Sequence, residues 1–151
     1  MIRRYQPADL PYVLDIWLNS NKEAHSFISA TYWDGNLEYM KQVLPQAELY
    51  VFEIENHVVA FVGLEKDYIA GIFIKQEYRS QGIGKQLLDF LKKRHSSLSL
   101  SVYDKNKKAL RFYVREGFHI LKEGLDTANN EKEFLMRWEN EFHIITGSSK
   151  G

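Results

Sequence analysis

Residues 79–85, Arg79-Ser80-Gln81-Gly82-Ile83-Gly84-Lys85, have the composition of an anion-binding turn. They follow an apolar run that predicts a strand and precede an amphipathic segment that predicts a helix. The first N–H groups of a helix have no partner within it and lie at the positive end of its dipole, so phosphate is a natural ligand there. The two glycines permit positive φ angles and a close approach of a ligand to the backbone, and Arg79 and Lys85 add positive charge.

Two common phosphate motifs fit this turn poorly. The Walker loop has four residues between its glycines and a Ser or Thr after its Lys, whereas Gly82 and Gly84 are close together and Gln86 follows Lys85. The dinucleotide fingerprint has a third glycine where this chain has Leu87. The turn by itself therefore leaves open an ordinary glycine-containing connection between a strand and a helix.

A second stretch, Asn106–Phe118, places an amide and a phenol on one predicted helix. Asn106 and Tyr113 are seven residues apart, which in a helix brings them to one face about 10.5 Å apart along the axis. Such a pair suits a long, thin ligand that is held at two points. For Tyr113 alone, the competing interpretation is a core aromatic residue at helical spacing.

Together the two stretches resemble the signatures of the GCN5-related N-acetyltransferases (GNAT). Arg79, Gly82 and Gly84 match the family's acyl-CoA loop, Arg/Gln-x-x-Gly-x-Gly/Ala, and the run from Asn106 through Phe-Tyr to Gly-Phe matches the other signature. The resemblance extends from about Met1 to Trp138, and residues 24–33 resemble a small bacterial subgroup. It implies an α/β fold of the mixed α+β kind, the GNAT acyl-CoA N-acyltransferase fold, with a central twisted mixed sheet and helices on both faces.

The resemblance also implies a direct reaction, in which an amine attacks the acetyl carbonyl of bound acetyl-CoA in a ternary complex. The strands at 68–74 and 98–102 would splay apart to admit the pantetheine arm. Tyr113 would be the general acid that protonates the leaving thiolate, for which a phenol with an unperturbed pKa near 10 is suitable. The cofactor-binding residues expected on this basis are Ile72, Ile74, Arg79, Ser80, Gln81, Gly82, Ile83, Gly84, Lys85 and Asn106.

The general base and the acceptor amine are less well specified. Glu65, at the end of a predicted strand, is the first candidate for a base acting through a water, and His25 is the second; a solvated surface side chain is the competing interpretation for both. The irregular segment 24–33 is expected on the acceptor side, with His25, Phe27 and Tyr32 contacting the substrate. The acceptor would be an amine-bearing small molecule, or a lysine or α-amine of a protein.

Two other kinds of function remain open. One is a catalytically silent module that binds acyl-CoA as a sensor, although such a module needs no acid at the sulfur atom. The other is a nucleotide-binding protein, against which the missing Walker residues and third glycine count. Release of free CoA in the presence of amines separates an enzyme from a sensor, and titration with ATP and NAD tests the nucleotide alternative.

The elements that position these residues follow from apolar periodicity. A helix is expected from Pro7 through Trp17, and a hairpin turn at Glu55–His57; Gly117 is expected to end the helix of Tyr113. The run Gly71–Ile74 predicts a strand that is buried on both faces. The other expected helices are 37–44 and 83–95, and the expected strands are 2–5, 49–54, 58–64, 68–74, 98–102, 118–121 and 134–138.

Length and composition favour one domain, residues 1–139, followed by a flexible tail, residues 140–151. The 20 basic and 20 acidic side chains balance, so no nucleic-acid or membrane partner is expected. The chain has no cysteine, which excludes an acyl-cysteine intermediate and thiolate metal sites, and no metal is expected. Without a signal peptide or a long apolar run, the expected location is the cytoplasm, as a monomer or homodimer.

Overall fold

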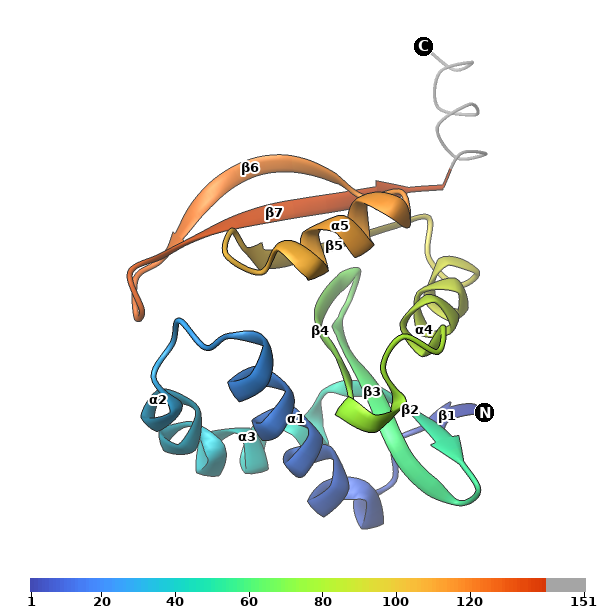
Figure 1. The fold of residues 1–151 in the computed structure, drawn as a ribbon. Helices are drawn as coiled ribbons and strands as arrows, with labels where there is room; N and C mark the ends of the chain where they lie inside the picture. The colour runs from blue at the N-terminus through green and yellow to red at the C-terminus, as the bar shows by residue number, and fades with distance from the viewer. Residues whose placement is uncertain (141–151) are drawn as a thin grey trace. The chain divides into compact units, whose positions relative to one another are not determined.

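The computed structural model describes residues 1–140 and has an α/β architecture in which seven strands form one mixed sheet (Figure 1). The strand order is β1-β2-β3-β4-β5-β7-β6. β4 and β5 pair in parallel, whereas β2 pairs antiparallel with β1 and β3, and β7 pairs antiparallel with β5 and β6. The predicted fold class is confirmed.

The strands are β1 (Ile2–Arg4), β2 (Glu48–Ile54), β3 (His57–Glu65), β4 (Tyr68–Ile74), β5 (Ser97–Tyr103), β6 (His119–Asp126) and β7 (Glu131–Glu139). The α-helices are α1 (Leu10–Ala24), α2 (Ala30–Gly35), α3 (Leu37–Val43), α4 (Ile83–Lys92) and α5 (Lys107–Arg115). Three short 3₁₀ helices are η1 (Pro7–Asp9), η2 (Leu44–Gln46) and η3 (Gln76–Tyr78).

The contacts divide the chain into two compact units. Unit 1 consists of Met1–Glu65 and Ala70–Leu87, and unit 2 consists of Lys66–Ile69 and the residues from Leu88 on. β4 therefore contributes its first two residues to unit 2 and its remainder to unit 1. Its pairing with β5 is limited to Tyr68 with Ser99 and Ile69 with Leu100, at the start of both strands.

The core of unit 1 lies between α1 and the strands β2 and β3. Val13 and Ile16 on the predicted apolar face of α1 are buried, as are alternate residues of β2 such as Leu49 and Val51. Every residue from Val58 to Leu64 in β3 is buried, so this strand has apolar neighbours on both faces. The hairpin turn before β3 is confirmed, since Glu55 and Asn56 adopt the positive φ angles that tight hairpin turns require.

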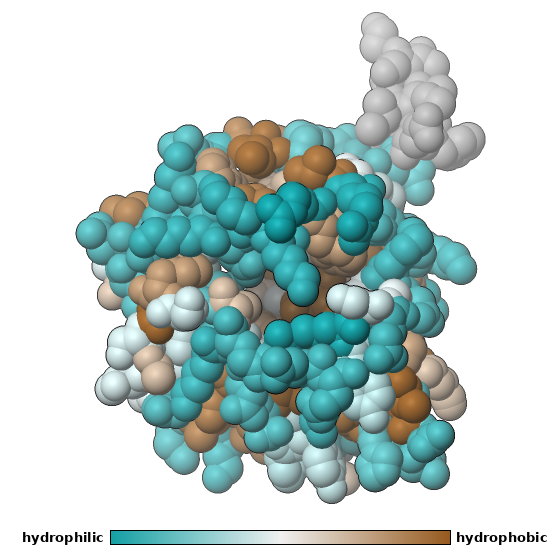
Figure 2. Space-filling model, in the orientation of Figure 1, coloured by the Kyte–Doolittle hydropathy of each residue, from teal (hydrophilic) through white to brown (hydrophobic). Residues whose placement is uncertain are grey.

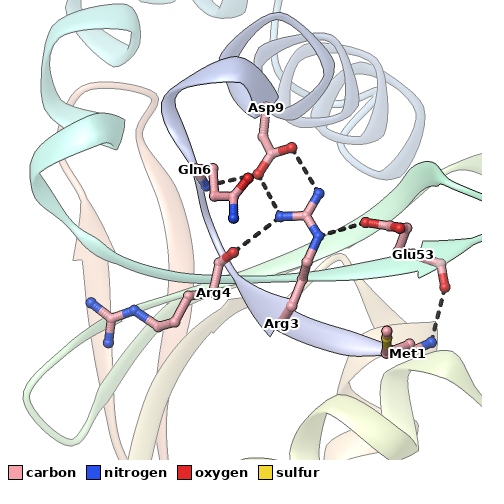
Figure 3. A network of polar contacts seen from close by, with 6 residues as sticks. All are labelled: Met1, Arg3, Arg4, Gln6, Asp9 and Glu53. Atoms are coloured by element: carbon pink, nitrogen blue, oxygen red, sulfur yellow. Dashed lines mark hydrogen bonds and ion pairs between the residues drawn. The ribbon is translucent and has the colours of Figure 1, made fainter.

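A charged network joins β1 to the start of α1 (Figure 3). The Arg3 guanidinium donates two hydrogen bonds of 2.9 Å to the carboxylate of Asp9 and a third to Glu53 on β2. Asp9 is only 5% exposed and also accepts a 2.8 Å hydrogen bond from the backbone N–H of Gln6. The buried carboxylate is therefore paired and fully hydrogen-bonded, as a buried charge must be.

The core of unit 2 is formed by α4, β5 and β7. Leu98, Leu100 and Val102 alternate along β5 and are buried, and their register partners on β7 include the buried Met136. Leu88 and Leu91 of α4 are also buried. Gly117, which follows α5, has a φ angle of +96°, in agreement with its predicted role at the end of that helix.

β6 is the edge strand of the described sheet and is almost entirely exposed. Its exposed apolar residues are Ile120, Leu121 and Leu125, and Figure 2 shows hydrophobic side chains at the surface over this strand. A β-bulge between Ile120 and Lys122 interrupts its pairing with β7. A bulge and a lysine on an edge strand both oppose further strand pairing.

Three expectations about the elements were wrong. Residues 24–33 include the start of an additional helix, α2, which begins after the cap residue Ser29 and is too short to show a helical period. The run Gly71–Ile74 is half-buried rather than buried on both faces, because in unit 1 it pairs on one side only, with β3. β6 and β7 both extend well beyond the predicted 118–121 and 134–138.

The single-domain boundary at residue 139 stays a prediction, and residues 141–151 of the expected tail lie outside the described residues. Within the part of the chain that the structure describes, no helix is long and apolar enough to cross a membrane.

Candidate functional site

The predicted anion-binding turn lies wholly in unit 1 and leads directly into α4. After η3, Arg79 is extended, Ser80 and Gly82 have φ angles of +62° and +82°, and α4 begins at Ile83. The N–H groups of the first α4 residues, Ile83, Gly84 and Lys85, therefore point out of the helix end. A side-chain carbon added to Gly82 would meet no atom within 4 Å, so the backbone here is open to a ligand.

The two glycines of the turn have different roles. Gly82 requires its positive φ angle, whereas Gly84 lies in the first turn of α4, is buried, and is not among the described glycines with a positive φ angle. Of the two glycines that could permit positive φ, Gly82 alone uses this freedom among the described residues of the turn. Ser80 takes up the second left-handed conformation, which the sequence pattern did not indicate because serine rarely adopts it.

Arg79 is held by neighbouring protein groups. Its Nε donates a 3.1 Å hydrogen bond to the carbonyl oxygen of Ile74, and its Nη2 lies 2.8 Å from Oε2 of Glu23 on α1. The Ser20 hydroxyl, also on α1, donates to the same Ile74 carbonyl at 3.3 Å. Because two donors fill the two lone pairs of that carbonyl, Ile74 can contact a ligand through its N–H but not through its oxygen.

Asn106 and Tyr113 both lie at α5 in unit 2. Asn106 is the N-cap of the helix, where its side-chain oxygen accepts a 3.3 Å hydrogen bond from the Ala109 N–H. The Tyr113 ring packs edge-to-face on Phe112 and on Phe118, with centroid separations of 5.2 and 5.6 Å. The structure thus gives Asn106 a structural role in addition to any contact with a ligand.

The environment of Tyr113 changes its acidity. Burial raises the pKa of the Tyr113 phenol well above its ordinary value, so the expectation of an unperturbed phenol was wrong. The hydroxyl therefore remains protonated at neutral pH.

The three predicted acceptor residues gather around one indole in unit 1. Trp33 is 7% exposed; His25 stacks on it at 5.7 Å, Tyr32 packs edge-on at 5.0 Å, and Phe27 packs edge-on against His25 at 5.6 Å. Burial lowers the pKa of His25 to about 4. At neutral pH His25 is therefore an uncharged imidazole, and it is a much weaker base than an ordinary histidine.

Glu65, the first candidate base, is exposed at the last position of β3, and the described contacts include no partner for it. The sequence did not indicate that Ser20 and Glu23 contact the turn. Both lie on α1, far from residues 79–85 along the chain. The Ser20–Ile74 contact spans 54 positions, and no local pattern indicates which polar residue of α1 faces the turn.

A shallow hollow of about 190 Å³ lies beside Arg79 and Glu23, between α1 and η3. Its lining is mostly polar and comprises Asp15, Ile16, Asn19, Ser20, Glu23, Lys75, Gln76 and Glu77. Among residues 1–140, no group of three or more His, Cys, Asp or Glu side chains is arranged to hold a metal ion.

Comparisons with known proteins agree with these features. The family model described as "Acetyltransferase (GNAT) domain" matches residues 45–120, which include β4, the turn and α5. The chain is 34% identical over 140 residues to the peptidyl-lysine N-acetyltransferase YiaC of Escherichia coli K12, covering 91% of this chain and 96% of the relative. It is 30% identical over 120 residues to the peptidyl-lysine N-acetyltransferase YjaB of Salmonella typhimurium, covering 79% and 83% of the two chains.

The fold is also found among solved structures. The solution structure of apo YjaB from Escherichia coli superposes with a TM-score of 0.83 at 24% identity, covering 93% of this chain and 97% of that one. At this level of identity the likeness concerns the fold, and it extends over the whole arrangement of strands and helices.

Proposed function

Because the chain belongs to the GNAT family of acetyltransferases, we propose that it transfers the acetyl group of acetyl-CoA to the ε-amine of a lysine in a protein. The activity itself, acetyl-CoA-dependent N-acetyl transfer, is that of the family. The lysine acceptor is supported by one observation: the chain aligns over nearly its full length with a relative named a peptidyl-lysine N-acetyltransferase.

The cofactor phosphates would bind at the start of α4. Open backbone at Gly82 and the N–H groups of Ile83, Gly84 and Lys85 provide donors and the positive end of a helix dipole. Ser80 and Gln81 complete the turn as exposed neighbours. The sequence carries no general positive charge that would draw in a polyanion, so these local groups would supply the binding energy.

The pantetheine arm would extend along the outer side of residues 70–74. In unit 1 this part of β4 is an edge strand, and an extended ligand binds such an edge through main-chain hydrogen bonds. The N–H groups of Ile72 and Ile74 are the proposed donors, and one of them would stabilise negative charge on the thioester oxygen. Asn106 is the proposed contact for an amide of the arm.

Transfer would then proceed directly from the thioester to the amine. The attacking nitrogen forms a bond to the acetyl carbon, the carbon–sulfur bond breaks, and Tyr113 donates a proton to the sulfur. A covalent acyl-cysteine route is excluded because the chain contains no cysteine. For the base that accepts the amine's proton, Glu65 is the better proposal, because His25, with a pKa of about 4, holds a proton poorly.

The test uses peptides that differ only in their amines. The full chain is incubated with acetyl-CoA and with an Nα-acetylated peptide containing one lysine, its arginine counterpart, and a peptide whose only amine is its N-terminus. We expect release of free CoA and one added acetyl group on the lysine peptide alone. Acetylation of the N-terminal amine instead would overturn the lysine assignment. Tight acetyl-CoA binding without turnover on any amine, including small polyamines, would favour a silent binding module.

A further inference from the structure

We propose that Arg79 and Glu23 are positioning residues, which fasten the end of β4 to α1 and thereby hold the phosphate-binding turn in shape. We call Ser20, Glu23, Arg79 and the Ile74 carbonyl the brace. The proposal rests on the assignment of the turn to the cofactor phosphates. It gives the arginine of the loop signature a role within the protein in place of a direct contact with phosphate, and it assigns a role to Glu23.

The first support is the geometry of Arg79. One edge of its guanidinium reaches back to the Ile74 carbonyl at 3.1 Å, and a terminal nitrogen reaches Glu23 at 2.8 Å. A planar guanidinium presents its donors in a fixed fork, so satisfying two partners of this kind fixes its orientation. Its charge is also largely neutralised by the carboxylate, which weakens any attraction to phosphate.

The second support is that α1 contributes twice. Ser20 and Glu23 lie one helical turn apart and face the same side of α1, as residues at i and i+3 do. Ser20 is 8% exposed, and its hydroxyl donates to the same Ile74 carbonyl that accepts from Arg79. Two side chains of one helix therefore meet the last residue of β4, one directly and one through Arg79.

The third support is the conformation of the turn. Directly after Arg79, Ser80 adopts a φ angle of +62°, and Gly82 follows at +82°. A left-handed serine is conformationally strained and persists only where the surrounding structure holds it. The brace fixes the residue before Ser80, while the start of α4 fixes the residues after Gly82.

The proposal predicts whether Glu23→Gln raises or lowers the acetyl-CoA Kd. If Arg79 were a phosphate ligand restrained by Glu23, then Glu23→Gln would release a cation and remove a nearby negative charge, and acetyl-CoA would bind more tightly. If the pair is part of the brace, Glu23→Gln loosens the turn and acetyl-CoA binds more weakly. Because both side chains are about one-third exposed, we expect a moderate effect that falls as salt is added.

The experiment measures the acetyl-CoA Kd by calorimetry for Glu23→Gln, Arg79→Gln, Arg79→Lys and the double variant Glu23→Gln/Arg79→Gln, each first shown to be folded. We expect each single variant to raise Kd by about three- to tenfold, and the double variant to be no worse than the weaker-binding single variant. Arg79→Lys should not rescue binding, since one ammonium cannot meet both partners.

Glu77→Gln is the matched control, because Glu77 is a carboxylate on η3 that lines the same hollow but is not part of the brace. Glu77→Gln should leave the acetyl-CoA Kd unchanged, or lower it slightly because a negative charge near the turn is removed. Tighter binding in Glu23→Gln, or equal weakening in Glu77→Gln, would overturn the proposal. If Gly82→Val weakens acetyl-CoA binding and Glu23→Gln does not, the brace proposal is refuted while the assignment of the turn to the cofactor stands. If neither variant changes the acetyl-CoA Kd, the assignment of the turn is refuted as well.

Discussion

At the scale of single residues, Tyr113 has the most specific proposed role. Tyr113→Phe retains the ring that packs on Phe112 and Phe118, so folding and acetyl-CoA binding should persist. It removes the proposed proton donor, and a positioned general acid contributes about 10²–10⁴ in rate. We expect single-turnover acetyl transfer to slow by about a hundredfold or more, with the acetyl-CoA Kd little changed. A nearly normal single-turnover rate would refute the acid role.

Gly82 is the residue on which the turn depends. A valine at this position would have to adopt a φ angle of +82°, which β-branched residues strongly disfavour, and would cover the open backbone. We expect Gly82→Val to weaken acetyl-CoA binding at least about tenfold, equivalent to about 1.4 kcal/mol, while the protein stays folded. Unchanged affinity in the folded variant would remove the turn from the cofactor site.

His25 makes the stability of the fold depend on pH. Its pKa is lowered to about 4, below the unfolded value near 6.5, so the folded state favours the neutral imidazole. Its contribution is present above pH 6.5 and is lost as the pH falls from about 6.5 to about 4. We expect the Tm of wild type to fall more over this range than the Tm of His25→Gln. Parallel Tm curves for the two proteins would contradict the buried, neutral histidine.

At the scale of the elements, the Arg3–Asp9–Glu53 network fastens β1 to the start of α1. Hydrogen bonds from Arg3 hold the pKa of Asp9 below its ordinary value, so this stabilisation is present above pH 4 and is lost as the pH falls through the lowered pKa. We expect Asp9→Asn to lower the free energy of unfolding at pH 7 by about 1.5–3 kcal/mol, measured by urea denaturation.

The control for Asp9→Asn is Asp34→Asn, which breaks an ion pair with Lys22 at a carboxylate that is 55% exposed. Exposed pairs contribute about 0–1 kcal/mol, so this variant should be close to wild type. Equal losses in the two variants would mean that burial of Asp9 adds nothing to the strength of its pairing.

The sequence was a good guide to those elements that depend on local signals. The hairpin at Glu55–Asn56 and the end of α5 at Gly117 were correctly predicted, because positive φ angles require particular residues. α2 was missed because six residues cannot show a helical period. The burial of residues 70–74 was wrongly predicted because an apolar run does not specify how many neighbours its strand has.

The elements that carry the candidate site residues were also predicted from local patterns. The turn at 79–85 and the stretch from Asn106 to Tyr113 are each short, continuous motifs. The spacing of residues within each motif was therefore enough to predict the turn and the helix that carry them. The brace depends on a contact between α1 and β4 that spans 54 positions, and the lowered pKa of His25 and raised pKa of Tyr113 depend on burial. Such properties arise from tertiary packing, and spacing along the chain does not encode them.

At the scale of the whole molecule, the sheet is continuous while the chain is divided into two units. β4 belongs to both units, and its residues 70–74 serve unit 1 as an edge. Edges of sheets normally need protection against further strand pairing, so an unpaired edge in unit 1 calls for an explanation. The proposed use of this stretch by an extended cofactor accounts for it.

β6 is the last strand in the sheet order, and its sequence bears on how the protein behaves at high concentration. When a strand pairs with a copy of itself about a two-fold axis perpendicular to the sheet, a residue on the axis lies opposite its own copy. When the axis passes through the middle of β6, that residue is Lys122 or Glu123. Like charges directly opposite each other destabilise a strand pair.

Lys122→Thr removes one of these repulsions and supplies a residue that favours strands. We expect this variant to self-associate at lower concentration than wild type in sedimentation velocity experiments, whereas Lys41→Thr on α3 makes the same change of charge away from the edge and should not. If wild type, Lys122→Thr and Lys41→Thr sediment identically, the charge of Lys122 does not limit self-association. Lys122 and Glu123 at the middle of β6 would thus oppose two-fold pairing of this strand, with its three exposed apolar residues, to a second copy of the chain.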